Sequence, residues 1–212
     1  MYILLTVVLS YIIGSIPPAL IIGKLFFKKD VRDYGSGNLG GSNTGRVLGK
    51  PVGLLVMILD QLKAVAAILL TATIVKNTNP DLLNLSIYLS ATSVLIGHCY
   101  TCFAKFKGGK AVACSFGIIF AANIYVYLIC VATYVLLLKI TKLVSLSSLI
   151  IFYIATLLLL IPCFQYSQII NTNLKYYSAI AMFIYATFVV YRHRSNIERL
   201  KKGTESKIKW MK

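Results

Sequence analysis

Six long apolar runs constrain this chain more than any other feature of its sequence. A helix needs roughly 20 mostly apolar residues to cross a bilayer, and in lipid it has to pair its own backbone polar groups. We therefore expect an all-α integral membrane protein, with residues 1–212 forming a single membrane-embedded domain. The runs are Met1–Phe27, Pro51–Val75, Leu85–Phe103, Ala111–Leu138, Val144–Phe164 and Tyr176–Tyr191.

The basic residues between these runs predict the orientation. The chain has 22 Lys and Arg against 6 Asp and Glu, a formal net charge of +16. Charge that lies between apolar runs, rather than on a polar surface, argues against a nucleic-acid binder. The positive-inside rule places the basic segments in the cytoplasm, with the N-terminus outside and the C-terminus cytoplasmic. These segments are Lys28–Lys50, Lys105–Lys110 and Arg192–Lys212.

The number of crossings follows from parity. The segment at Lys105 and the tail are assigned to one side, so an even number of crossings separates them, whereas three apolar runs lie between. The run Ala111–Leu138 is too long for one ordinary span and contains Asn123 near its middle. We predict two short helices there, about Ala111–Ala121 and Ile124–Leu138, and hence seven transmembrane helices, some of them short. Five crossings is the alternative, if two of the runs do not cross.

The first motif is the glycine-rich segment Gly35–Arg46, with glycines interleaved with small hydroxyl and amide residues. Successive backbone N–H groups of such a segment can converge on an anion, and Arg46 can hold a phosphate in a bidentate fork. No Gly-Lys-Ser/Thr follows, so it is not a nucleotide P-loop. The alternative interpretation is a flexible loop of turn-forming residues.

The second motif is Lys105–Lys110, preceded by Gly97-His98. Two glycines flanked by lysines can cradle a phosphate, since lysine acts as a compact point charge. A cytoplasmic anchor would use the same residues. The nearby Cys99-x-x-Cys102 pair has no second pair, so we interpret its cysteines as packing residues rather than metal ligands.

The third motif is Arg192–Lys207. Arg192, Asn196 and Arg199 recur at helical spacing, which predicts an interfacial helix facing the site or anionic headgroups. A charged membrane anchor is the alternative.

Taken together and in order, the motifs resemble a known family. They read Gly35-Ser36-Gly37-Asn38-x-Gly-x-x-Asn43-x-x-Arg46, then Gly97-His98 with Phe106-Lys107-Gly108-Gly109-Lys110, then His193-Arg194-x-Asn196-Ile197-x-Arg199-Leu200-x-x-Gly203-x-Glu205-x-Lys207. This is similar to the bacterial acyl-phosphate:glycerol-3-phosphate acyltransferase family, PlsY.

The chain departs from the family pattern in both glycine-containing motifs. Gly40-Gly41-Ser42-Asn43 stands where the family usually has Gly-Ala-Thr-Asn. Ala111 stands in place of a glycine, and Cys114 in place of a threonine. Because alanine can occupy a helix start, we expect these changes to tune affinity rather than reaction type.

The resemblance implies a reaction. The 1-hydroxyl of glycerol-3-phosphate attacks the carbonyl of a fatty acyl phosphate, giving lysophosphatidate and phosphate in the first acylation of phospholipid synthesis. The expected partners are these two substrates and membrane lipid, with no nucleic acid, no cofactor and no metal. We expect a monomer in the bacterial inner membrane, multi-pass, with its active site facing the cytoplasm.

Residue types suggest how the work is divided. We expect Ser36, Asn38, Arg46, His193 and Asn196 to be catalytic, with either His193 or the departing phosphate taking the hydroxyl proton. The predicted substrate-binding residues are Gly35, Gly37, Gly40, Ser42, Asn43, Lys105, Lys107, Gly108, Gly109, Lys110 and Glu205, of which Glu205 would order the tail.

Two other functions fit basic loops between apolar helices. A transporter of a phosphorylated solute would need an inverted repeat, and the second half has no matching glycine-rich motif. An alcohol phosphotransferase would need several intramembrane aspartates on Mg²⁺, whereas Asp60 is the only acid within an apolar run. Asp60 and Lys63 lie three residues apart, so we interpret them as a local ion pair.

Overall fold

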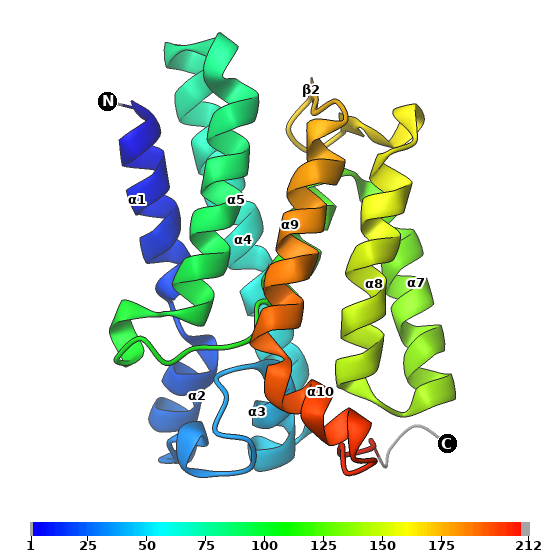
Figure 1. Ribbon diagram of the computed structural model, residues 1–212. Helices are drawn as coiled ribbons and strands as arrows, with labels where there is room; N and C mark the ends of the chain where they lie inside the picture. The colour runs from blue at the N-terminus through cyan, green and yellow to red at the C-terminus, as the bar shows by residue number, and fades with distance from the viewer. Residues whose placement is uncertain (1, 209–212) are drawn as a thin grey trace. The chain divides into compact units, whose positions relative to one another are not determined.

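The computed structural model describes residues 2–208 (Figure 1). The chain divides into two compact units, Met1–Ile118 and Ile119–Lys212. Both units are built from helices, so the predicted all-α membrane class is confirmed apart from one short hairpin.

The first unit is organised by three long helices that pack against one another: α1 (Tyr2–Ser15), α4 (Lys50–Thr78) and α5 (Leu83–Cys99). Small residues let α1 and α5 approach closely. A Cβ placed on Gly14 would lie 2.5 Å from the Val94 carbonyl oxygen, and the Ser10 and Ser90 hydroxyls are hydrogen-bonded at 2.7 Å. Small and hydroxyl residues are the usual contacts between membrane helices, where apolar burial gives little driving force.

The first apolar run is broken by its two prolines, as the sequence predicts. After α1, Ile16 and Pro17 are not helical, and α2 (Pro18–Phe27) begins with Pro18 at its first position. Proline suits that position because the N–H it lacks would have no helical partner there. The helix is capped at Lys28, which adopts a left-handed φ of 53°, and the next residue, Lys29, donates its N–H to the Gly23 carbonyl at 3.0 Å.

Short elements connect the long helices of the first unit: η1 (Val31–Asp33), α3 (Gly41–Leu48), η2 (Pro80–Leu82) and η3 (Cys102–Ala104). Helix α3 packs against α4 through glycines. A Cβ on Gly53 would lie 2.6 Å from the Gly45 Cα and 2.7 Å from the Gly41 carbonyl oxygen. Two of the glycines of the first motif therefore serve helix packing, which the sequence-based interpretation missed although their four-residue spacing signals it.

The second unit contains α7 (Ile124–Thr141), α8 (Val144–Leu159) and α9 (Tyr177–Arg192), in which α8 packs against both of the others. Helix η4 (Pro162–Phe164) and a hairpin of β1 (Tyr166–Ser167) and β2 (Thr172–Asn173) join α8 to α9, and α10 (Arg194–Lys201) follows. Tyr166 pairs with Asn173 and Ser167 with Thr172. The sequence did not predict the hairpin.

The predicted break at Asn123 is confirmed. Helix α6 (Val112–Ala122) ends there and α7 begins. The Asn123 side chain accepts hydrogen bonds from the backbone N–H groups of Tyr125 and Val126, at 2.9 and 3.0 Å, which satisfies donors at the start of α7. Helix α7 ends at Lys142, again with a left-handed φ of 60°.

Residues 2–208 contain seven apolar helical segments, of two kinds. Four are long enough to cross a membrane: Tyr2–Phe27, Lys50–Thr78, Pro80–Ala104 and Ile124–Thr141. Three are shorter: Val112–Ala122, Val144–Leu159 and Tyr177–Arg192. The 11 residues of α6 rise about 16 Å, roughly half of a hydrocarbon core of about 30 Å. The total of seven crossings and the orientation of the termini stay predictions.

Candidate functional site

Two glycines and one buried asparagine determine the backbone conformation of the first motif. Gly35 and Gly37 have φ values of 61° and 67°, a left-handed conformation that costs other residues energy. The Asn43 side chain is buried, and its hydrogen bonds in the described part of the chain go to nearby backbone groups. Its Oδ1 accepts from the Ser36 N–H at 2.8 Å, and its Nδ2 donates to the carbonyls of Val31 and Tyr34 at 2.9 and 3.2 Å. Asn43 therefore holds the loop, and its predicted contact with substrate stays a prediction.

The other polar residues of the first motif face outward. Ser36, Ser42 and Arg46 are exposed, and Asn38 and Gly40 are half-buried. Within residues 2–208, the structure gives no hydrogen bond or ion pair to the side chains of Ser36, Asn38, Ser42 or Arg46. A fixed backbone thus presents hydroxyl, amide and guanidinium donors, the set that suits a phosphate.

A small apolar core joins the first motif to the second. It contains Val31 and Leu39 from the first region and Ala104 from the second. Arg32 adds a polar link, because its Nη1 donates to the Ala104 carbonyl at 3.4 Å. Arg32 also forms a bidentate pair with Asp30, and this pairing holds the pKa of the Asp30 carboxyl well below its usual range. The structure therefore brings two of the three predicted motifs onto one support.

The second motif is anchored to the end of α5. The N–H of Gly108 donates to the Cys99 carbonyl at 3.1 Å, and the N–H of Gly109 donates to the His98 carbonyl at 3.0 Å. These two N–H groups therefore hold the segment against the end of α5. Any contact of Gly108 and Gly109 with substrate stays a prediction. Lys105 and Lys107 are exposed and Lys110 is half-buried.

Residues other than glycine take the left-handed positions of the second motif region. Lys105, Phe106 and Ala111 have φ values of 56°, 58° and 67°. Ala111 precedes the first residue of α6. Ala111 does stand at the helix start, because its carbonyl accepts the Ser115 N–H at 2.8 Å, but its φ disfavours a Cβ. The expectation that the change tunes affinity stays a prediction.

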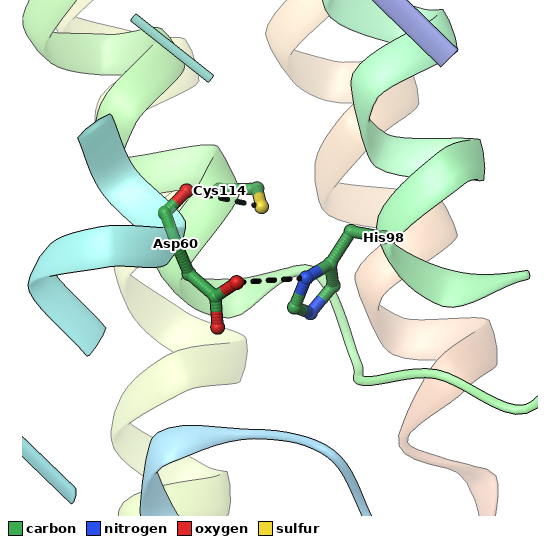
Figure 2. A group of neighbouring side chains, drawn as sticks. All are labelled: Asp60, His98 and Cys114. Carbon is green, nitrogen blue, oxygen red and sulfur yellow. Dashed lines mark hydrogen bonds and ion pairs between the residues drawn. The ribbon is translucent and has the colours of Figure 1, made fainter. Parts of the chain in front are cut away.

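A buried charged cluster lies next to Gly109 of the second motif, and Figure 2 draws two of its members, Asp60 and His98, together with Cys114. Asp60, Lys63 and His98 are 0, 8 and 6 % exposed. The Lys63 Nζ lies 2.7 Å from Asp60 Oδ1 and 3.1 Å from His98 Nδ1, and the His98 Nδ1 lies 3.3 Å from Asp60 Oδ1. The predicted Asp60–Lys63 pair is confirmed. The sequence did not reveal that His98 joins it, because 35 residues separate His98 from Lys63.

Cys114 completes this cluster, and its thiol donates to the Asp60 backbone carbonyl at 3.3 Å. The candidate ligand atoms of Asp60, His98 and Cys114 all lie within 4.8 Å of one another, a spacing that could suit a metal ion. However, the Lys63 ammonium already lies against both Asp60 and His98. A divalent cation would have to displace that charge, so the donor set does not fit a metal well. The expectation of a metal-independent enzyme stays a prediction.

The third motif belongs to the second unit and is organised by one carboxylate. Glu205 Oε1 accepts hydrogen bonds from Asn196 Nδ2 at 2.7 Å and Ser145 Oγ at 2.8 Å, and Oε2 accepts from Arg199 Nε at 2.7 Å. Burial alone would raise the pKa of Glu205, but the bonds from Asn196, Ser145 and Arg199 outweigh it and lower the pKa. Glu205 thus links the tail to Ser145, Asn196 and Arg199, and its predicted part in substrate binding stays a prediction.

His193 lies between α9 and α10 and is buried. Its Nδ1 lies 2.8 Å from the Val189 carbonyl oxygen, which only an N–H can approach favourably. The neutral ring therefore carries its proton on Nδ1 and its acceptor lone pair on Nε2. Asn196 is also buried, one helical turn further on.

Comparison with known proteins assigns the family. A family model described as glycerol-3-phosphate acyltransferase matches residues 4–203. This chain belongs to the glycerol-3-phosphate acyltransferase family. The predicted family resemblance is confirmed.

Members of the glycerol-3-phosphate acyltransferase family match almost the whole chain. A glycerol-3-phosphate acyltransferase of Listeria monocytogenes serotype 4a is 42% identical over 203 residues, covering 96% of this chain and 95% of the relative. Another, from Staphylococcus carnosus, is 41% identical over 214 residues and covers 100% of both chains. The crystal structure of PlsY, an integral membrane glycerol 3-phosphate acyltransferase in its glycerol 3-phosphate form, matches with a TM-score of 0.82 and 32% identity, covering 97% of this chain and 95% of that one.

Proposed function

We propose that this chain is a glycerol-3-phosphate 1-O-acyltransferase that uses a fatty acyl phosphate as its donor. One observation carries the proposal. In a chain of this family, two motifs rich in phosphate-type donors stand on one small core of the first unit. The products are lysophosphatidate and inorganic phosphate.

The chemistry needs positioning and charge stabilisation more than a covalent intermediate, because an acyl phosphate is already activated. The 1-hydroxyl oxygen forms a bond to the acyl carbonyl carbon, and the bond from that carbon to the phosphate oxygen breaks. Donors aligned on the developing charge lower the barrier. We assign Ser36, Asn38 and Arg46 to the transferred group and one phosphate. The second phosphate falls to Lys105, Lys107 and Lys110.

The hydroxyl proton has two possible acceptors, the departing phosphate and His193. The hydrogen bond from His193 Nδ1 to Val189 supports the second, since it puts the acceptor at Nε2. The variant His193→Ala distinguishes these two proton acceptors when its turnover is measured at saturating substrate. Near-normal turnover rules out His193 as general base, whereas a loss of about 10²–10⁴-fold supports it.

The assay for the reaction uses purified protein in detergent with palmitoyl phosphate and labelled glycerol-3-phosphate. Palmitoyl-CoA replaces the donor in a parallel tube. Asn38→Ala tests the site, and Asn77→Ala, an exposed amide at the end of α4, is the matched control. We expect lysophosphatidate from the acyl phosphate only, lost in Asn38→Ala and kept in Asn77→Ala. Product from palmitoyl-CoA would overturn the donor, and no product from folded protein would redirect the question to solute uptake by liposomes.

The proposed placement is the bacterial inner membrane, with the first and second motifs facing the cytoplasm. Two exposed cysteines report on it without mutagenesis, Cys102 beside the second motif and Cys163 after α8. With a membrane-impermeant maleimide, we expect Cys102 to be labelled in inverted vesicles and Cys163 in right-side-out vesicles. The reverse pattern would overturn the orientation, and labelling of both from one side would overturn the seven crossings.

A further inference from the structure

His98 meets the glycine pair of the second motif in two ways. Its backbone carbonyl accepts the Gly109 N–H at 3.0 Å. A Cβ placed on Gly109 would overlap the His98 ring, at Nε2, whereas a Cβ placed on Gly108 would overlap the His98 backbone oxygen. Gly108 and Gly109 are not among the described residues with positive φ. They are required for close approach rather than for an unusual backbone conformation.

The His98 ring is itself held by buried charge. Its Nδ1 lies 3.1 Å from the Lys63 Nζ and 3.3 Å from Asp60 Oδ1. The same Lys63 Nζ donates to the Ile16 carbonyl at 2.7 Å, where α1 gives way to α2. Breaking a buried ion pair leaves an uncompensated charge and is strongly unfavourable. The ring therefore has little freedom to turn away from the glycine beside it.

Stability alone does not account for such a cluster. Apolar residues of similar volume usually stabilise a buried position as well as an ion pair does, or better. What the charges provide here is a fixed ring position, and that ring lies against Gly109, which stands with Gly108 between Lys107 and Lys110. Cys114 adds a further tie from α6 to the Asp60 backbone (Figure 2).

We propose that Asp60 and Lys63 hold His98 as a positioning residue for the Gly108–Gly109 segment, and through it for Lys107 and Lys110. The segment is held between the His98 ring and the α5 carbonyls, so the two lysines on either side keep a fixed separation. The consequence for catalysis rests on the proposed function, which assigns these lysines to a substrate phosphate.

A pair of double variants tests the contact. Gly108→Ala and Gly109→Ala are each combined with His98→Ala, and the unfolding temperature in detergent is measured along with kcat/KM. Alanine at 109 is opposed by a side chain, so removing the ring should relieve it. Alanine at 108 is opposed by a backbone oxygen that every residue carries, so Gly108→Ala is the matched control.

We expect Gly109→Ala to lower the unfolding temperature and to lower kcat/KM by about tenfold or more. The double variant with His98→Ala should recover part of both. No restoration is expected in the Gly108→Ala background. Equal effects of His98→Ala in both backgrounds would overturn the proposal. The unfolding temperature needs no substrate, so this result stands even if wild-type protein transfers no acyl group and the proposed function fails.

A second measurement separates positioning from folding. For Asp60→Asn and Lys63→Met, we expect KM for glycerol-3-phosphate or the acyl phosphate to rise about tenfold, while kcat changes by less than about threefold. Ser90→Ala, also buried on α5 and bonded to Ser10, is the control that should leave both constants unchanged. A purely structural role would lower the yield of active protein with KM unaltered, and that outcome would overturn the proposal.

Discussion

In the first motif, Gly35 and Gly37 adopt positive φ and leave polar side chains around them exposed. In the second motif, Gly108 and Gly109 do not have positive φ, and both are buried against α5. The left-handed positions there fall to Lys105 and its neighbours instead. Gly35 and Gly37 therefore serve backbone conformation, whereas Gly108 and Gly109 serve close approach, and substitutions should separate the two uses.

The largest effect should come from Gly108→Ala. Its Cβ would overlap a backbone oxygen, which cannot turn away as a side chain can, and overpacking of this kind costs up to about 3 kcal/mol. We expect a clear fall in unfolding temperature in detergent. Gly40→Ala is the stability control, because no atom lies within 4 Å of a Cβ built there. Equal stability of the two variants would contradict the close-approach role.

The conformational role of the first motif predicts a smaller cost. Gly37→Ala should lose about 1 to 2 kcal/mol through its left-handed φ, since its Cβ would meet only the Arg32 carbonyl oxygen at 3.3 Å. Gly35→Ala should lose more, because its Cβ would also overlap the Asn43 Oδ1 that holds the loop. Gly37→Asn should be milder than Gly37→Ala, since asparagine tolerates this region. Thermal unfolding of the three variants ranks them, and a tolerated Gly37→Val would refute the conformational argument.

Introducing a glycine at a left-handed position should raise stability, in contrast to the removal of one. Ala111→Gly should stabilise the protein by roughly 1 kcal/mol, because glycine relieves the left-handed conformation at a modest entropic cost. The unfolding temperature should rise by a few degrees. Ala113→Gly lies within α6 and should instead destabilise. If both substitutions lower the unfolding temperature, the strain at Ala111 is not a significant cost.

The third motif is held by hydrogen bonds to the Glu205 carboxylate rather than by glycines. Because a carboxylate titrates, we expect the stability of this region to depend on pH, by at most about 1 kcal/mol. The pKa of Glu205 is lowered from 4.5 in the folded protein. Its contribution is therefore complete above pH 4.5 and is lost as pH falls through the lower folded value. The protection factors of α10 and the following residues, which correct hydrogen exchange for its intrinsic pH dependence, should be constant from neutral pH down to that range and then fall. In Glu205→Gln, exchange should be faster at neutral pH and lack the acid transition.

Much of the fold could be predicted because lipid imposes strong rules on sequence. The lengths of the apolar runs predicted the long helices. The proline pair and Asn123 predicted where two of the runs are interrupted. The hairpin of β1 and β2 escaped prediction, because two-residue strands leave no periodic pattern. The same holds for contacts across long sequence distances, such as Ser10 with Ser90.

The candidate site was predicted by residue type more reliably than by role. A role for Glu205 in the tail was predicted, whereas Asn43 and the N–H groups of Gly108 and Gly109 are used to hold their own loops. A sequence motif records that a residue is needed without recording whether a ligand or a neighbouring backbone needs it. The link from Lys63 to His98 was equally hidden, since it depends on the packing of α4 against α5.

Four lysines among the described residues have a left-handed φ, and three of them connect the stability of this protein with its insertion into the membrane: Lys28, Lys105 and Lys142. Glycine at these positions would relax the backbone, as it would at Ala111. Each such exchange would also delete a positive charge of the kind that guides the orientation of a nascent membrane helix during insertion. Substitutions meant to raise the thermal stability of the protein should therefore begin with Ala111→Gly, which relieves backbone strain without removing a charge. At these three lysines, substitution by glycine would stabilise the folded state but would increase the fraction of chains inserted with inverted topology.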